Sequence, residues 1–142
     1  MLTKEYIAGF FDGEGCIRIN KWFRKRGSKF GGCYDYTLGT KLTNSNRMVL
    51  DECKTLYGGF IGEVEDKRKS TYKKKYAWEL KSNDAVKLLR DILPLLLVKR
   101  QEAALAIYFQ AYKKSLKGMD YTSYVEQLRW RDDCFVEMRN LK

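Results

Sequence analysis

The segment Ile7-Ala8-Gly9-Phe10-Phe11-Asp12-Gly13-Glu14-Gly15 is the most informative part of this chain. At helical spacing, Gly9 and Gly13 lie four residues apart on one side of a helix, with Ala8 beside them. Small residues on a helix face allow another backbone to approach closely. Gly15 is the type of residue that closes a helix at its C-terminal end. We therefore predict a short N-terminal helix with a glycine-bearing face.

A carboxylate stands at the end of this helix. Glu14 lies near the negative end of the helix dipole, which costs roughly 0.3–1 kcal/mol unless a positive charge compensates. A bound divalent cation would provide that compensation. A purely structural interpretation is also open, because Ile7, Phe10 and Phe11 suit the core of an ordinary helix and residues 12–15 suit a solvated turn. Composition alone does not separate the two interpretations.

The order of residues 7–15 resembles the LAGLIDADG motif of homing endonucleases, with conservative changes only. The resemblance implies an α+β fold of order αββαββα, with a four-stranded antiparallel saddle sheet that binds DNA and extra helices at the C-terminus. In that family the motif helix forms the interface between two halves, and the final acid binds the catalytic metal. The resemblance therefore implies Mg²⁺ (or Mn²⁺) at Glu14 and Gly13.

This chain carries one copy of the motif, so the resemblance implies a homodimer with twofold symmetry. The expected interface residues are small or acidic: Ala8, Gly9, Asp12 and Gly13. Asp12 is expected to cap or tether the helix of the partner, and the two Glu14 carboxylates are expected to meet near the axis, where their repulsion favours a cation.

Two further positions extend the resemblance. In single-motif members a polar amide residue follows the second strand and contacts the metal-bound solvent, and Asn44 occupies that place here. Members more often have Gln, so the reach of Asn44 is one methylene shorter. A lysine beyond a helix-breaking proline also belongs to the family's active site, and Lys99 follows Pro94 in this chain. The predicted catalytic residues are Glu14, Asn44 and Lys99.

Charge and composition favour a polyanionic partner. The 142 residues include 28 Lys and Arg against 18 Asp and Glu, a net charge of +10, with no histidine to supply imidazole chemistry. Such an excess favours nucleic acid or an anionic membrane, and no apolar run approaches the ~20 residues of a membrane span. We expect double-stranded DNA as partner, with no membrane and no small-molecule substrate. Four scattered cysteines without metal-ligand spacing favour an intracellular protein with reduced thiols.

Alternating polarity predicts two hairpins followed by helices. Strands are expected at 16–24 and 34–43, with Ile17, Ile19 and Phe23 inward, and at 60–66 and 72–80, with Ala77 outward. The intervening loops are expected at 25–32 and 67–71. Helices are expected from a cap at Asn44 or Ser45 to about 57, at 82–93, from 100 to about 115, and from 121 to about 140. In the first of these helices Met48, Leu50, Cys53 and Leu56 form the predicted buried side. We predict one domain over residues 1–142, with the motif helix at about 4–14 and the C-terminal helices at about 99–141.

The outer face of the predicted sheet and its loops are rich in basic side chains, interleaved with Asn20, Trp22 and Thr37. Cations can contact phosphates while polar groups read base edges; a merely solvated polar face is the alternative. The predicted DNA-contacting residues are Arg18, Asn20, Trp22, Arg24, Lys25, Arg26, Lys29, Thr37, Lys41, Lys67, Arg68, Lys69, Lys73 and Lys75.

Together these expectations describe a dimeric, Mg-dependent, site-specific DNA endonuclease of the homing type. The resemblance implies a double-strand break with 3′ overhangs at a long, nearly palindromic site. The alternative is a non-catalytic nucleic-acid binder on the same fold, either an intron maturase or a DNA-binding regulator. Such members usually lose the motif acid, and this chain retains Glu14.

Overall fold

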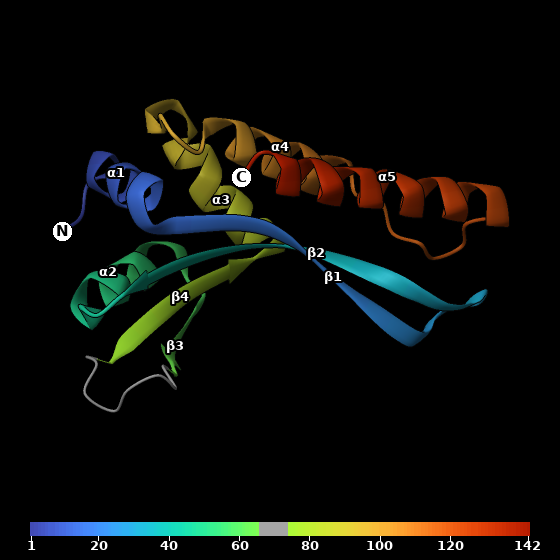
Figure 1. Cartoon of the computed structure of the whole chain (residues 1–142), viewed down its shortest axis with the longest axis horizontal. Coiled ribbons are helices and arrows are strands. Elements are labelled where there is room, and N and C mark those ends of the chain that lie inside the picture. The colour runs from blue at the N-terminus through green and yellow to red at the C-terminus, as the bar shows by residue number, and fades with distance from the viewer. Residues whose placement is uncertain (66–73) are drawn as a thin grey trace.

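A computed structural model describes residues 1–65 and 74–142 of the chain, without the side chains of residues 27 and 28. The elements follow the predicted order αββαββα, with further helices after them (Figure 1). Their bounds are α1 Lys4–Glu14, β1 Gly15–Ser28, β2 Gly31–Asn44, α2 Arg47–Tyr57, β3 Phe60–Val64, β4 Lys75–Lys81, α3 Ser82–Ile92, η1 Leu93–Leu95, α4 Arg100–Tyr112 and α5 Tyr121–Asn140.

The four strands form one antiparallel sheet in the order β1-β2-β4-β3. Helices α1, α3, α4 and α5 lie along one side of this sheet (Figure 1). The inward residues of β1 and β2 alternate as predicted, since Ile17, Leu38 and Leu42 are each 1% exposed or less. The α+β fold class with a four-stranded antiparallel sheet is confirmed.

A single cluster of buried residues draws on every α-helix and strand of the described chain. Its largest members include Trp78, Phe11 and Phe109. The Trp78 indole N–H donates to the Gly58 carbonyl at 2.8 Å, so this large ring is buried without leaving its donor unpaired. The core therefore ties the N-terminal helix to the sheet and to the C-terminal helices.

Helix α1 begins and ends for identifiable reasons. The Thr3 hydroxyl accepts a hydrogen bond from the Tyr6 amide at 3.1 Å, a standard N-cap. Gly15 ends the helix differently from our prediction, because its backbone is extended (φ −77°, ψ 161°) and starts β1 directly. A Cβ at Gly15 would lie 2.6 Å from the Phe11 carbonyl oxygen. Glycine is needed here for close approach and not for a left-handed turn.

The cap and the buried side of α2 were predicted wrongly. Asn46, not Asn44 or Ser45, caps the helix by accepting from the Met48 amide at 3.1 Å. Leu50 and Cys53 are buried as expected, but Met48 is 77% exposed and Leu56 is 45% exposed. The buried face continues from Leu50 to Tyr57, seven residues on, which is two full turns. Met48 and Leu56 lie outside this buried face and therefore remain in solvent.

The first hairpin is longer than its alternation indicated. Residues 25–28 and 31–32, predicted as loop, continue the two strands, and Gly31 takes up the turn with φ +101°. Phe23, predicted inward, is 56% exposed because this distal half extends beyond the helix-covered core. Ala77, predicted outward, is 4% exposed, since it lies in a central strand between Thr43 and Gly62.

The second hairpin and the C-terminal helices follow the expected order with shorter elements. Helix α4 ends at Tyr112, about three residues before the predicted end. The predicted turn at 67–71 and the strand ends at 66 and 72–73 lie outside the described residues. Within the described chain, no helix combines the length and apolar character needed to cross a bilayer.

Candidate active site and nucleic-acid interface

The motif helix has one buried face and one open face. Ile7, Ala8 and Phe11 are each 1% exposed or less and pack into the core of their own chain. At Gly9 and Gly13, by contrast, an added Cβ would meet no atom of the described residues within 4 Å. Ala8, predicted in the dimer interface, therefore lies on the other side of the helix. The open face consists of the two glycines.

Asp12 holds the segment between η1 and α4. Its carboxylate accepts three backbone hydrogen bonds, from Leu97 (2.7 Å), Val98 (3.2 Å) and Lys99 (3.1 Å). Burial alone would raise the pKa of Asp12, but the three N–H groups and the nearby Lys99 charge outweigh it and lower that pKa. Asp12 was expected to tether a partner helix. The tether instead runs to its own chain, 85–87 residues later in sequence.

The side chain of Lys99 also binds Asp12, at the backbone of that residue. Its ammonium donates to the backbone carbonyl of Asp12 at 2.6 Å. Lys99 is thus held against the last turn of α1, two residues before Glu14. Glu14 is the last residue of the helix and its side chain is exposed. The structure therefore brings Lys99 and the end of the motif helix together, across a long sequence separation.

β2 ends at Asn44, close to the point where α1 ends and β1 begins. The register pairs Gly15 with Leu42, so the strand runs two residues past the start of β1 to reach Asn44. The Asn44 amide oxygen accepts from the Asn46 backbone N–H at 2.7 Å, which fixes the side chain in an Asx turn. Glu14, Lys99 and Asn44 therefore lie at one end of the molecule, where α1, β2 and the 96–99 segment meet.

The end of α1 offers few donors for a divalent cation. The described residues contain no group of three or more His, Cys, Asp or Glu side chains that could hold a metal ion. At the end of α1 there are one exposed carboxylate, Glu14, and the carbonyl groups of the last helical turn. Carboxylate and carbonyl oxygens are the donors that Mg²⁺ prefers, but a full coordination sphere needs more of them. The donor set fits half of a shared site.

The outer face of the sheet carries most of the predicted DNA contacts. Register places Arg18 opposite Gly39, Asn20 opposite Thr37, and Trp22 opposite Asp35 on this face. Exposed side chains are Arg18, Trp22, Arg24, Lys25, Arg26, Lys29 and Lys75, and half-buried ones are Asn20, Thr37 and Lys41. Lys67, Arg68, Lys69 and Lys73 lie outside the described residues. Arg24 forms an ion pair with Asp35 at 3.1 Å, which sequence reasoning did not foresee.

Sequence reasoning also missed two exposed aliphatic residues beside the motif helix. Leu97 is 83% exposed and Val98 is 72% exposed, although both are large and apolar. Their backbone amides are the ones bound by Asp12, so they lie next to α1. The apolar run after Pro94 was a usable signal. Exposed apolar side chains that lie together often mark a surface that another protein covers.

Comparison with known proteins gives a family and a fold. The sequence pattern of the family described as LAGLIDADG endonuclease matches residues 7–100. No curated protein matches the chain. The structure is similar to that of the homing endonuclease I-CvuI bound to its target, with 19% identity, a TM-score of 0.72, and coverage of 98% of this chain and 81% of that chain.

Two further solved structures show the same fold. The archaeal intron-encoded homing endonuclease I-Vdi141I, complexed with DNA, has 20% identity and a TM-score of 0.71, with 98% of this chain and 83% of that chain covered. The homing endonuclease I-GzeII, in complex with its DNA target, has 18% identity and a TM-score of 0.62. That match covers 95% of this chain but 44% of the other, so this protein aligns with less than half of the longer enzyme.

Proposed function

Because this chain belongs to the LAGLIDADG endonuclease family, we propose that it is a site-specific DNA endonuclease of the homing type, which cuts both strands of a long, nearly palindromic duplex as a homodimer. The observation that carries the proposal is the end of α1. There an open two-glycine face, an exposed carboxylate at Glu14 and a lysine held by Asp12 adjoin one another. I-CvuI and I-Vdi141I, which share the fold, were solved with DNA.

The open face of α1 supports the homodimer. Gly9 and Gly13 leave room for a second backbone, and a twofold axis through this face would bring two copies of α1 together. The exposed Leu97 and Val98 side chains lie beside the same helix and would be covered by the partner. We leave Ala8 out of the proposed contact, because it is 1% exposed in its own chain. In this arrangement the two Glu14 residues face each other across the axis.

Glu14 and the Gly13 carbonyl, from both copies, would hold a divalent metal ion, and we propose Mg²⁺ or Mn²⁺. When bound, the ion polarises the scissile phosphates and favours a hydroxide-like nucleophile. Lys99 places a positive charge where negative charge develops on the phosphate in the transition state. Asn44, fixed by its Asx turn, presents its amide group to the attacking water. Asp12 positions Lys99 and touches no reacting atom.

The outer face of the sheet supports duplex binding. Its exposed cations can neutralise backbone phosphates, while Asn20, Trp22 and Thr37 lie between them and can reach base edges. The proposed location of the protein is intracellular. Its four cysteines, Cys16, Cys33, Cys53 and Cys134, are all free thiols, as expected for reducing surroundings.

The proposal is tested with Glu14→Gln, which keeps the size of the side chain and removes its charge. The wild-type protein is first incubated with a randomised duplex library and Mg²⁺, and cleaved molecules are selected and sequenced. On the selected site, Glu14→Gln should reduce cleavage at least about a hundredfold because the shared metal ligand is lost. Its DNA affinity should remain within about twofold of the wild type, since no sheet contact changes.

Two results would contradict this proposal. A wild-type protein that binds a defined site but never nicks it with Mg²⁺ or Mn²⁺ is a non-catalytic binder. A protein that remains monomeric in sedimentation, both alone and on DNA, has no partner for the open face of α1. Glu5→Gln serves as the matched control, because Glu5 is an exposed acid in the first turn of the same helix.

A further inference from the structure

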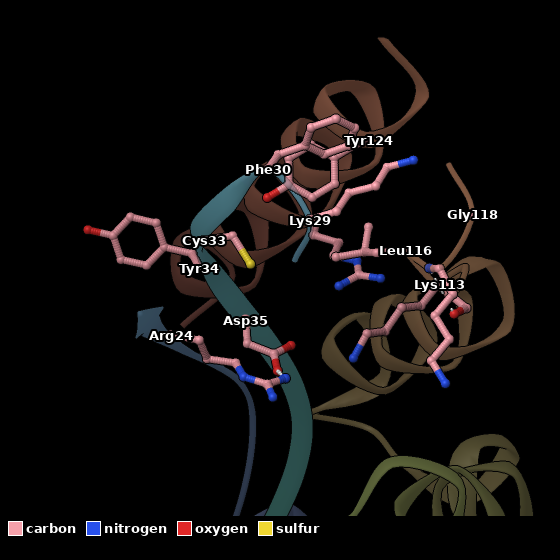
Figure 2. Close-up of a pocket in the computed structure, with 13 residues that line it drawn as sticks. Arg24, Lys29, Phe30, Cys33, Tyr34, Asp35, Lys113, Leu116, Gly118 and Tyr124 are labelled. Carbon is pink, nitrogen blue, oxygen red and sulfur yellow. Dashed lines mark hydrogen bonds and ion pairs between the residues drawn. The ribbon is translucent and has the colours of Figure 1, made fainter. Parts of the chain in front are cut away.

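A basic cleft lies away from the proposed active site, between the distal half of the first hairpin and the C-terminal helices. It has a volume of about 570 Å³ and is lined from β1, β2, the 113–118 connection and α5. Figure 2 shows Arg24 and Asp35 side by side on the hairpin, Lys113 on the helical side, and Phe30 against Tyr124 at the far end. This cleft was not predicted from the sequence.

Its lining has a strong excess of positive charge. The cationic side chains are Arg24, Lys29, Lys113, Lys117 and Arg131, and Asp35 is the one carboxylate among the lining residues that the structure describes. Arg24 already pairs with Asp35 at 3.1 Å. The other four cations therefore have no carboxylate of their own among these lining residues.

Two of these cations are removed from water. Arg131 is 3% exposed and donates to the Gln127 side chain at 3.0 Å and to the Lys114 carbonyl. Lys113 is half-buried and donates to the Tyr36 carbonyl. Burial, which is the largest cause, lowers the pKa of both groups, and the Arg131 charge lowers that of Lys113 further. Their hydrogen bonds go to neutral acceptors. The Asp35 charge acts against the lowering of both pKa values, but this one carboxylate also pairs with Arg24, so compensation is incomplete.

We propose that this cleft is a phosphate-binding site. A phosphate oxyanion would add negative charge to that of Asp35 beside Lys113 and Arg131, with several acceptor oxygens for N–H groups. The source of the phosphate is either the backbone of bound DNA or free inorganic phosphate. The DNA backbone is favoured, because Asp35 and Trp22 are paired on the same face of the hairpin, which places the cleft beside the outer face. The C-terminal half would then contribute to binding.

The test uses two substitutions with opposite expected signs. Lys117→Glu reverses an exposed lining charge and should weaken phosphate binding about tenfold. Asp35→Asn removes the competing carboxylate and should tighten it several-fold, a gain that misfolding would not produce. Lys87→Glu is the matched control, because Lys87 is an exposed lysine on α3 outside the cleft and gives the same net charge.

Inorganic phosphate is titrated against chloride at equal ionic strength, and the thermal midpoint is recorded. Saturating phosphate should raise the midpoint of the wild type and of Lys87→Glu by about 3 °C. Lys117→Glu should keep less than about 1 °C of this shift at the same concentration. If phosphate gives no shift beyond chloride, or the same shift in all four proteins, the proposal is wrong.

Duplex binding then identifies the source of the phosphate. If the cleft takes the DNA backbone, Lys117→Glu should lower the slope of log affinity against log salt by about 1 relative to Lys87→Glu. Equal slopes, together with the phosphate shift, assign the cleft to free phosphate. Neither measurement requires cleavage, so this site can fail or stand independently of the proposed endonuclease activity.

Discussion

The two halves of the first hairpin are held in place by different forces. In the half next to α1, Ile17, Ile19 and Leu38 are at most 3% exposed and pack under the helices. In the distal half, Phe23 and Tyr34 are 56% and 49% exposed and stack edge-to-face on each other at 5.4 Å. Figure 1 shows this distal half projecting away from β3 and β4, alongside α5.

Polar contacts to α5, together with ring contacts from Phe30 to Tyr121 and Tyr124, hold the distal half. Asp132 accepts from the Lys21 ammonium at 2.7 Å and from the Tyr36 hydroxyl at 2.8 Å. The Lys21 ammonium also lies 4.5 Å from the centre of the Tyr34 ring. The comparison shows that burial fixes the half that positions the proposed active site. Charged and aromatic contacts to α5 hold the half that carries much of the proposed DNA surface, and the charged ones are sensitive to pH and salt.

The largest expected difference is in stability. Leu38→Ala should lower the free energy of unfolding by about 3 kcal/mol, because the Leu38 side chain is fully buried and its removal leaves a cavity. Phe23→Ala in the distal half should cost less than about 1 kcal/mol, because its ring already contacts water. Urea unfolding followed by circular dichroism measures both. Equal losses would show that the two halves form one equally buried unit.

A smaller effect is expected where α1, which packs beside the buried half, meets the 96–99 segment. Asp12→Ala removes the acceptor for three backbone N–H groups and should cost about 2 kcal/mol of stability. It should also lower kcat with little change in KM, because Lys99 loses its fixed position. Asp12→Asn retains one acceptor oxygen, so its stability and kcat should fall between those of the wild type and of Asp12→Ala. An Asp12→Ala enzyme with unchanged kcat would show that the tether does not position Lys99.

The smallest effect is expected at the link between the distal half and α5. Asp132→Asn should cost about 1 kcal/mol, a figure discounted because both partners of the ion pair are partly exposed. Hydrogen bonds from Lys21 and Tyr36 lower the pKa of Asp132. Its contribution is therefore complete above the unfolded-state pKa of about 3.9 and is lost as the pH falls through the lower folded-state pKa.

Stability measured against pH checks this sign. The difference between wild type and Asp132→Asn should be constant from neutral pH to about pH 5, shrink as the pH falls further, and vanish below the folded-state pKa of Asp132. A difference that persists unchanged in strong acid would mean that the carboxylate charge has no part in the contact. Burial and the bond to Asp132 raise the pKa of Tyr36, so this hydroxyl remains a donor throughout.

Periodicity was a reliable guide where side chains are buried by their nearest elements. Ile19, Leu38 and Leu42 alternate with polar or small residues, and the sheet follows that alternation. It was a poor guide for Phe23 and Met48, because an apolar residue at the right spacing is buried only if another element covers that position. The caps show the same limit, since Asn44, Ser45 and Asn46 offer similar side chains and the end of β2 selects the last.

Local order in the chain was enough to establish the motif helix, the two hairpins and the family, because these depend on residues within a few turns of one another. The partner of Asp12, the exposure of Leu97 and Val98, and the basic cleft depend on packing between segments about 85–110 residues apart. No pattern along a single chain encodes such pairings, since hydrogen bonds and burial between distant segments exist only once the core has brought them together.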